Sequence, residues 1–222
     1  MRNSLAMLVA VTVVLSLATD AYAWTPTRTP MQVPTATPTP TTPLPPADAF
    51  QVRYSSNLSI GDSVVNLTNA GTQGGEHPAG NICANVYAFD ASGSMIACCS
   101  CPITPNALES LSAKNDLTSN TLTPGVPTSI IVKLLATTPI GTTPSCNASS
   151  PTFANLAPGM RAWGTTLHAL PTTPVTYGLT ETEFSPAVLS ASELAELTGD
   201  CEFIQTDGQG FGICKSCRLG GL

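Results

Sequence analysis

The chain has little charge, few aromatic residues and almost no histidine. Charged residues make up 10% of the sequence, whereas they make up about 25% of typical globular proteins. The 14 acidic residues outnumber the 8 basic ones, so the net charge is −6. Such a chain lacks the basic surface that binds nucleic acid. These shortages argue against a nucleic-acid partner, and 2 histidines leave little material for acid–base catalysis.

The motifs that carry chemistry are missing as well. The sequence contains no Gly-x-Ser-x-Gly, no His-Glu-x-x-His and no phosphate-binding glycine loop. The available acid–base groups are a Glu76–His77 pair in an expected loop, His168 on an expected strand, and Glu181 and Glu183, which would share one strand face. No nucleophile motif accompanies them. We therefore expect no enzyme, no metal site and no cofactor.

Long apolar runs are absent after the N-terminus. Leu5–Leu17 follows Arg2 and precedes the small-residue cleavage pattern Ala21-Tyr22-Ala23, as in a secretory signal peptide. Asp20 ends the apolar run before it reaches the roughly 20 residues of a membrane span. Residues 1–23 are thus predicted to be a signal peptide. The mature protein is expected to be secreted, extracellular or cell-surface, without a membrane span.

A threonine- and proline-rich segment follows at residues 24–48. Proline removes backbone donors and favours an extended path, so this segment is predicted to be a semi-rigid linker. Such tracts are also substrates for O-linked glycans, here for example at Thr37 and Thr39. The pattern for N-linked glycans occurs at three asparagines: Asn57, Asn66 and Asn147.

What the chain does have is an even number of cysteines outside the signal segment. In an exported protein these are expected to pair as disulfides. The Cys98-x-x-Cys101 and Cys214-x-x-Cys217 spacings also leave a zinc site or a redox pair as weaker alternatives. The eight residues are Cys83, Cys98, Cys99, Cys101, Cys146, Cys201, Cys214 and Cys217.

The position of the cysteines constrains their pairing. In an extended strand, Cys99 and Cys101 face one side and Cys98 faces the other. We expect the Cys98–Cys101 cluster to hold the C-terminal tail and one neighbouring strand. Cys146 or Cys201 would then attach the helical region.

From residue 49 onward the hydrophobic pattern mostly alternates, which indicates short strands separated by turns. One helix is expected after Ser190-Ala-Ser-Glu193, a capping box, with Gly199 as its end. The predicted fold of residues 49–222 is all-β: a disulfide-stapled, jelly-roll-like β-sandwich with one short C-terminal helix. The predicted strands are Phe50–Tyr54 (continuing through Leu58 and Ile60), Val64–Leu67, Ile82–Phe89, Met95–Cys101, Ala107–Ala113, Ser129–Leu135, Met160–Leu170 and Val175–Thr180.

Four segments of the chain resemble a group of secreted acidobacterial proteins that have no assigned activity. The resemblance extends over most of the chain from Phe50 onward, and the double-cysteine segment is its most specific part. The threonine–proline segment resembles the group least. The resemblance implies a bacterial source and export, and it brings no catalytic residues. The four segments are Asn81–Asp90, Cys98–Asn106, Asn115–Thr123 and Gly212–Arg218.

Two classes of function follow from these observations. The first is a structural subunit of an extracellular fibre or surface layer, a homopolymer in which residues 49–68 complete a neighbour's sheet. The alternating residues of that strand would be Phe50, Val52, Tyr54, Leu58 and Ile60. The same strand folded within its own chain is the simpler possibility.

The second class is a secreted monomeric binding module or, less favoured, a small hydrolase. Such a module would bind a surface or a carbohydrate. A carbohydrate would stack on an aromatic face formed by Trp163 with Tyr54, Tyr87 and Tyr177. A hydrolase would need His77 or His168 beside a carboxylate or serine.

Overall fold

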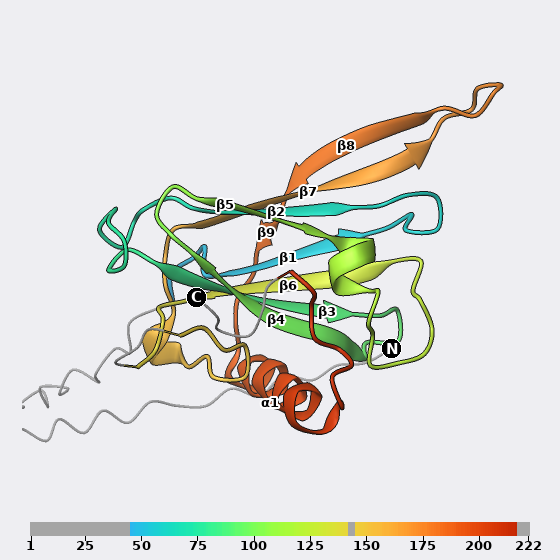
Figure 1. Cartoon of the computed structure of the whole chain (residues 1–222). Coiled ribbons are helices and arrows are strands. Elements are labelled where there is room, and N and C mark those ends of the chain that lie inside the picture. The colour runs from blue at the N-terminus through green and yellow to red at the C-terminus, as the bar shows by residue number, and fades with distance from the viewer. Residues whose placement is uncertain (1–44, 142–144, 217–222) are drawn as a thin grey trace, which may run out of the picture. The chain divides into compact units, whose positions relative to one another are not determined.

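In a computed structural model, residues 45–141 and 145–216 are described, and they form nine strands and one long helix (Figure 1). The predicted signal peptide, nearly all of the linker, Thr37, Thr39 and Cys217 lie outside these ranges. Each predicted strand has a counterpart, and β9 is an additional one. The bounds are β1 Phe50–Ser55, β2 Val64–Asn69, β3 Ile82–Phe89, β4 Met95–Ile103, β5 Leu108–Ser112, β6 Ile130–Thr137, β7 Met160–Ala169, β8 Tyr177–Glu183, β9 Ser185–Pro186 and α1 Ala191–Asp207.

The strands form two antiparallel sheets that face each other. Sheet A has the order β4-β3-β6-β1-β9, and sheet B has the order β5-β2-β7-β8. Two shorter helical turns, a π-helical turn at Ala113–Leu117 and a 3₁₀ turn at Phe153–Asn155, lie in the connections. The prediction of an all-β, sandwich-like fold with a C-terminal helix is confirmed.

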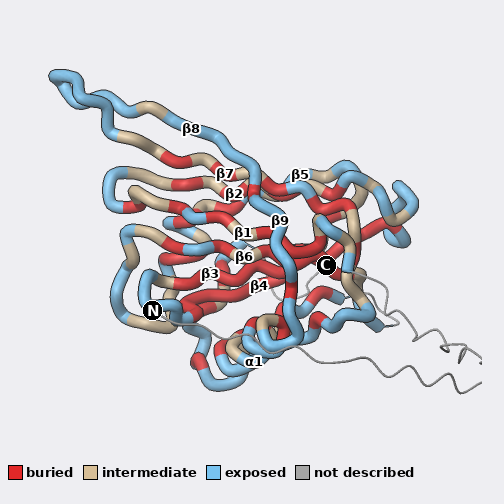
Figure 2. Tube along the Cα trace, turned by 180° about the vertical axis from the view of Figure 1, so that it is seen from behind, coloured by how far each residue is buried: buried red, intermediate tan, exposed pale blue. Residues whose placement is uncertain are grey.

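Sheet A is the middle one of three layers. All eight residues of β3 are buried, because sheet B covers one face of the strand and α1 covers the other (Figure 2). One apolar core, which includes Val86 and Leu134, lies between the sheets. A second core, which includes Tyr87 and Leu197, lies between sheet A and α1. A strand buried on both faces reads as a continuous apolar run, and Ile-Cys-Ala-Asn-Val-Tyr-Ala-Phe has this character.

Helix α1 begins where the sequence predicts and ends later. The Ser190 hydroxyl accepts a hydrogen bond from the Glu193 amide at 3.1 Å, which caps the first turn. The Glu193 carboxylate pairs with Lys133 Nζ on β6 at 2.6 Å. The predicted end at Gly199 is wrong: the helix continues to Asp207, because Cys201 and Ile204 prolong its buried stripe.

The edges of the sheets differ in how they are protected. Along β4, the Cys98 amide donates to the Gly212 carbonyl at 2.8 Å, and Ile213 forms a parallel bridge with Cys98. Strand β9 has two residues, one of them a proline. Strand β8 is exposed over most of its length and forms with β7 a hairpin that projects from the sandwich (Figure 1). In the described ranges no helix is long and apolar enough to span a bilayer.

Candidate functional site

The predicted assembly strand, β1, lies inside sheet A of its own chain. It pairs with β6 from Phe50 to Ser55, and with β9 only at Gln51 and Val52. Within the described residues it forms no ladder with β2, the next strand along the chain. Residues 56–63 instead cross from sheet A to sheet B. All strand partners of β1 are therefore remote from it in sequence.

The strand ends earlier than the hydrophobic pattern predicts. Asn57 has a φ of 63°, a left-handed conformation that interrupts an extended strand. Leu58 lies in the crossing segment, where it is 3% exposed and packs in the core between the sheets. Ile60 is 39% exposed in the same segment. The expected continuation of the strand through Leu58 and Ile60 is thus wrong.

The two faces of β1 have unequal polarity. Phe50 and Val52 face α1, where they join the second core, and Tyr54 on the same face is 60% exposed. The opposite face, which points toward sheet B, carries Gln51, Arg53 and Ser55. The inward side chains of this strand are therefore polar.

Arg53 is the central residue of this polar face and one that the sequence analysis missed. It is 7% exposed, and burial lowers the pKa of its guanidinium. The guanidinium donates to the hydroxyls of Thr182 at 3.2 Å, Ser55 at 3.0 Å and Thr166 at 2.8 Å. No described carboxylate pairs with it. Gly164 on β7 leaves the space that the guanidinium occupies.

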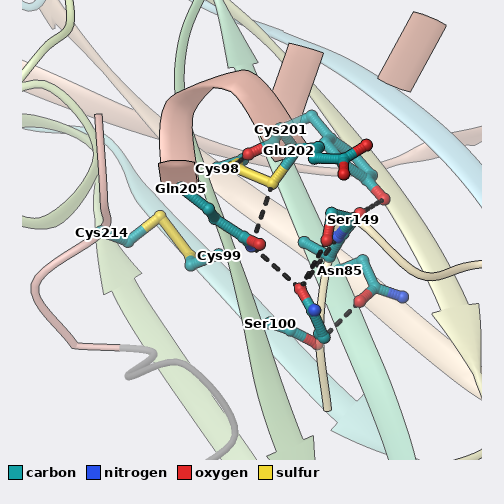
Figure 3. Close-up of a disulfide and its surroundings, with 12 residues drawn as sticks. Asn85, Cys98, Cys99, Ser100, Ser149, Cys201, Glu202, Gln205 and Cys214 are labelled. Atoms are coloured by element: carbon teal, nitrogen blue, oxygen red, sulfur yellow. Dashed lines mark hydrogen bonds between the residues drawn. A yellow bond between two sulfur atoms is a disulfide. The ribbon is translucent and has the colours of Figure 1, made fainter. Parts of the chain in front are cut away.

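The cysteines bind the layers together. Cys98 and Cys99 are neighbours on β4 and face opposite sides: Cys98 bonds to Cys201 on α1, and Cys99 bonds to Cys214 in the C-terminal segment (Figure 3). Cys83 on β3 bonds to Cys146. Cys101 is disulfide-bonded too. Disulfide bonding, expected from export and cysteine count, is therefore present.

A polar network lies beside the helix disulfide (Figure 3). The Gln205 side-chain amide donates to Cys201 Sγ at 3.5 Å and to Asn147 Oδ1 at 2.9 Å. Ser100 donates to Asn85 Oδ1 at 2.7 Å. The Gln205 contacts join α1 to the segment after Cys146, and the Ser100 contact joins β4 to β3.

The three asparagines of the N-glycosylation pattern differ in their surroundings. Asn57 is half-buried, and its amide donates to the Leu167 carbonyl at 2.9 Å. Asn66 faces outward from β2 and accepts a hydrogen bond from Ser110 at 2.7 Å. Asn147 is exposed, although its carbonyl oxygen accepts from Ser149 and Gln205. Asn147 is the most accessible of the three.

The structure does not bring the candidate acid–base groups together. His77 is exposed, and its Nδ1 lies 3.1 Å from Asn81 Oδ1. His168 Nε2 lies 2.8 Å from the Thr180 hydroxyl. Among the described residues, neither imidazole contacts a carboxylate, and no group of three His, Cys, Asp or Glu side chains has metal-binding geometry.

The four aromatic residues of the expected carbohydrate face are separated. Tyr87 is fully buried, and its hydroxyl donates to the Ala148 carbonyl at 2.8 Å. Burial raises the pKa of that hydroxyl. Tyr54 belongs to sheet A, while Trp163 and Tyr177 lie on β7 and β8 of sheet B. The four residues therefore form no common platform. Trp163 does line a shallow depression of about 200 Å³ with Arg161 and Glu183.

The architecture is that of a disulfide-linked β-sandwich in which sheet A is bonded to a C-terminal helix through Cys98 and Cys201. Comparisons with protein-family models, curated proteins and solved structures give no match. The function is therefore argued from the geometry of β1 and its surroundings.

Proposed function

We propose that the chain is a structural subunit of an extracellular fibre or surface assembly, in which β1 of one copy completes sheet A of the next. The observation that carries this proposal is that β1 takes all its strand partners, β6 and β9, from remote parts of the sequence. A strand with this connectivity makes the same contacts whether it belongs to the same chain or to a neighbour.

The energetic argument concerns what exchange changes. The β1–β6 ladder, the Phe50 contacts with the α1 side and the Arg53 hydrogen bonds are all preserved when the strand comes from another copy. Only the crossing segment must adopt a different path, because the residues before Phe50 stay attached to β1. Exchange therefore loses entropy because two copies associate, and it gains free energy if the strain in that connection is released.

The connection itself favours exchange. It contains Asn57 at a φ of 63°, a left-handed conformation that costs free energy for residues other than glycine, although less for asparagine than for most. Leu58, the next residue of the connection, is held in place, since its amide donates to the Thr128 carbonyl at 2.9 Å. Short hinges under strain promote domain swapping. We therefore propose residues 56–57 as the hinge of the exchange.

The extracellular setting is part of the proposal. Disulfides persist in oxidising compartments outside the cytosol, and the N-terminal segment has the pattern of a signal peptide. Low charge suits association between strands, because charged side chains are a common means of preventing it. A head-to-tail exchange of this type need not close on itself, and an exchange that stays open yields filaments.

The test is electron microscopy and analytical ultracentrifugation of the oxidised, secreted chain without its signal segment. We expect regular filaments. A chain beginning at residue 45 should still assemble, whereas a chain beginning at residue 61, which lacks β1, should not. Uniform monomers of the full chain would contradict the assembly. Filaments formed without β1 would contradict strand exchange.

A matched pair of insertions tests the hinge. Four Gly/Ser residues inserted after Asn57 should relax the connection and shift the chain toward monomers. The same insertion at Gly93, in the exposed β3–β4 turn, should leave assembly unchanged. Equal assembly of the two variants would contradict a strained hinge.

A further inference from the structure

The outer face of sheet B presents one tryptophan between polar side chains. The strand register places Trp163 directly between Asn66 on β2 and Glu183 on β8. Arg161 lies two residues before Trp163 on the same face of β7. Ala162 and Gly164, which alternate with them, are buried between the sheets. The indole, a guanidinium, an amide and a carboxylate therefore share one open surface.

This surface is hollowed where the chain passes from sheet B to sheet A. The depression of about 200 Å³ is lined by Trp163, Arg161 and Glu183 of this face, and also by Ala162, Phe184, Gln51 and Pro186. Arg161 is held by Asp48, with Nη1 3.1 Å from the carboxylate. Among the described residues, the Glu183 carboxylate and the indole N–H of Trp163 have no hydrogen-bond partner. These two groups are available to a ligand.

We propose that this depression binds one or two rings of a neutral polysaccharide. A half-buried indole on a flat sheet offers an apolar face against which the C–H face of a sugar ring can stack. Glu183 and Arg161 supply an acceptor and donors for ring hydroxyls, the usual combination of an aromatic wall with a few directed polar groups.

The charge of the surroundings decides against an acidic polysaccharide. Arg161 is neutralised by Asp48, and Glu181 lies two residues before Glu183 on the same face of β8. The local charge is therefore negative, so a uronate or sulfate would be repelled. The site does not depend on strand exchange, because Gln51 occupies the same place whether β1 comes from this copy or a neighbour.

Fluorescence tests the site directly, because the chain has 2 tryptophans. Trp24→Phe leaves Trp163 as the single indole, in monomers and filaments alike. The mature, oxidised variant is titrated with hexasaccharides of β-1,4-linked glucose, N-acetylglucosamine, xylose and mannose. We expect a saturable change in emission with at least one of them and none with hexagalacturonate.

Two further variants in that background complete the test. Glu183→Ala removes a charged hydrogen-bond acceptor and should weaken binding about tenfold or more. Tyr54→Ala, which removes an exposed aromatic residue of sheet A, should leave binding unchanged. No saturable change with any neutral sugar, or equal affinity after Glu183→Ala, would overturn the proposal. If electron microscopy shows only monomers, the proposed assembly is contradicted, but the sugar-binding result still stands.

Discussion

At the scale of single residues, Arg53 shows how a local pattern can mislead. Alternation of Phe50, Val52 and Tyr54 predicts an apolar strand face, and that face exists. Yet the side chains of β1 that lie between the two sheets are the polar ones, because Thr166 and Thr182 of sheet B supply hydroxyls for the guanidinium of Arg53. A buried cation without a carboxylate partner relies wholly on such hydrogen bonds.

This arrangement predicts a strong coupling between Arg53 and Gly164. A Cβ added at Gly164 would lie 2.8 Å from Arg53 Cζ, so Gly164→Ala should lower the free energy of unfolding by about 1–3 kcal/mol. In an Arg53→Ala background the same substitution should have little effect. Urea denaturation of the four oxidised proteins gives the coupling energy.

Gly125→Ala is the matched control, since nothing lies within 4 Å of its added Cβ. It should leave the unfolding free energy nearly unchanged. If Gly164→Ala is equally destabilising with and without Arg53, the guanidinium is not what requires glycine there.

At the scale of elements, α1 is the most informative case. The cap at Ser190 is local and was predicted, whereas the end of the helix depends on what the helix packs against. Leu194, Leu197, Cys201 and Ile204 form its buried stripe, and this stripe continues past Gly199. Packing of an amphipathic face, more than propensity, stabilises most helices in proteins.

Gly199 should therefore be a weak point inside a helix. Gly199→Ala meets no atom within 4 Å, so we expect stabilisation by about 0.5–1 kcal/mol. Gly212→Ala should destabilise, because Gly212 has a φ of 77° and its added Cβ would lie 2.8 Å from Ile204 Cγ2. Thermal unfolding tests whether stability rises in Gly199→Ala and falls in Gly212→Ala. Destabilisation by Gly199→Ala would show that the helix ends at this glycine.

At the scale of the whole molecule, the disulfides connect segments far apart in the chain. The Cys98–Cys201 and Cys99–Cys214 bonds span 103 and 115 residues. Both leave β4, one toward α1 and the other toward the C-terminal segment. The middle sheet is thus attached on both of its faces.

Removal of the Cys98–Cys201 disulfide should weaken the attachment of α1 to sheet A. Closing a loop of this length contributes about 4–5 kcal/mol in the chain-entropy model, so Cys98→Ala with Cys201→Ala should lower the unfolding free energy by a similar amount. Hydrogen exchange in α1 should also become faster. Cys83→Ala with Cys146→Ala is the comparison and should accelerate exchange in α1 less, because that disulfide has no cysteine on the helix. Equal exchange in the two variants would contradict a role for the bond in docking α1.

The sequence by itself determined the elements whose signal is local. Eight strands, the start of α1 and the opposite faces of Cys98 and Cys99 follow from alternation, turn residues and capping. Disulfide bonding also followed, from an even cysteine count and a signal-like N-terminus. Two-residue β9 gave no such signal.

Tertiary structure alone decided everything that depends on a remote partner. Which face of β1 lies between the sheets is decided by the hydroxyls of β7 and β8, and the end of α1 is decided by its contact with sheet A. The pairing of cysteines is likewise a matter of which segments become neighbours. The depression around Trp163 arises because β2, β7 and β8 align in register. Apart from the β7–β8 pairing, these features depend on contacts between residues far apart in the chain, up to 115 positions for Cys99 and Cys214, and no local pattern encodes such contacts.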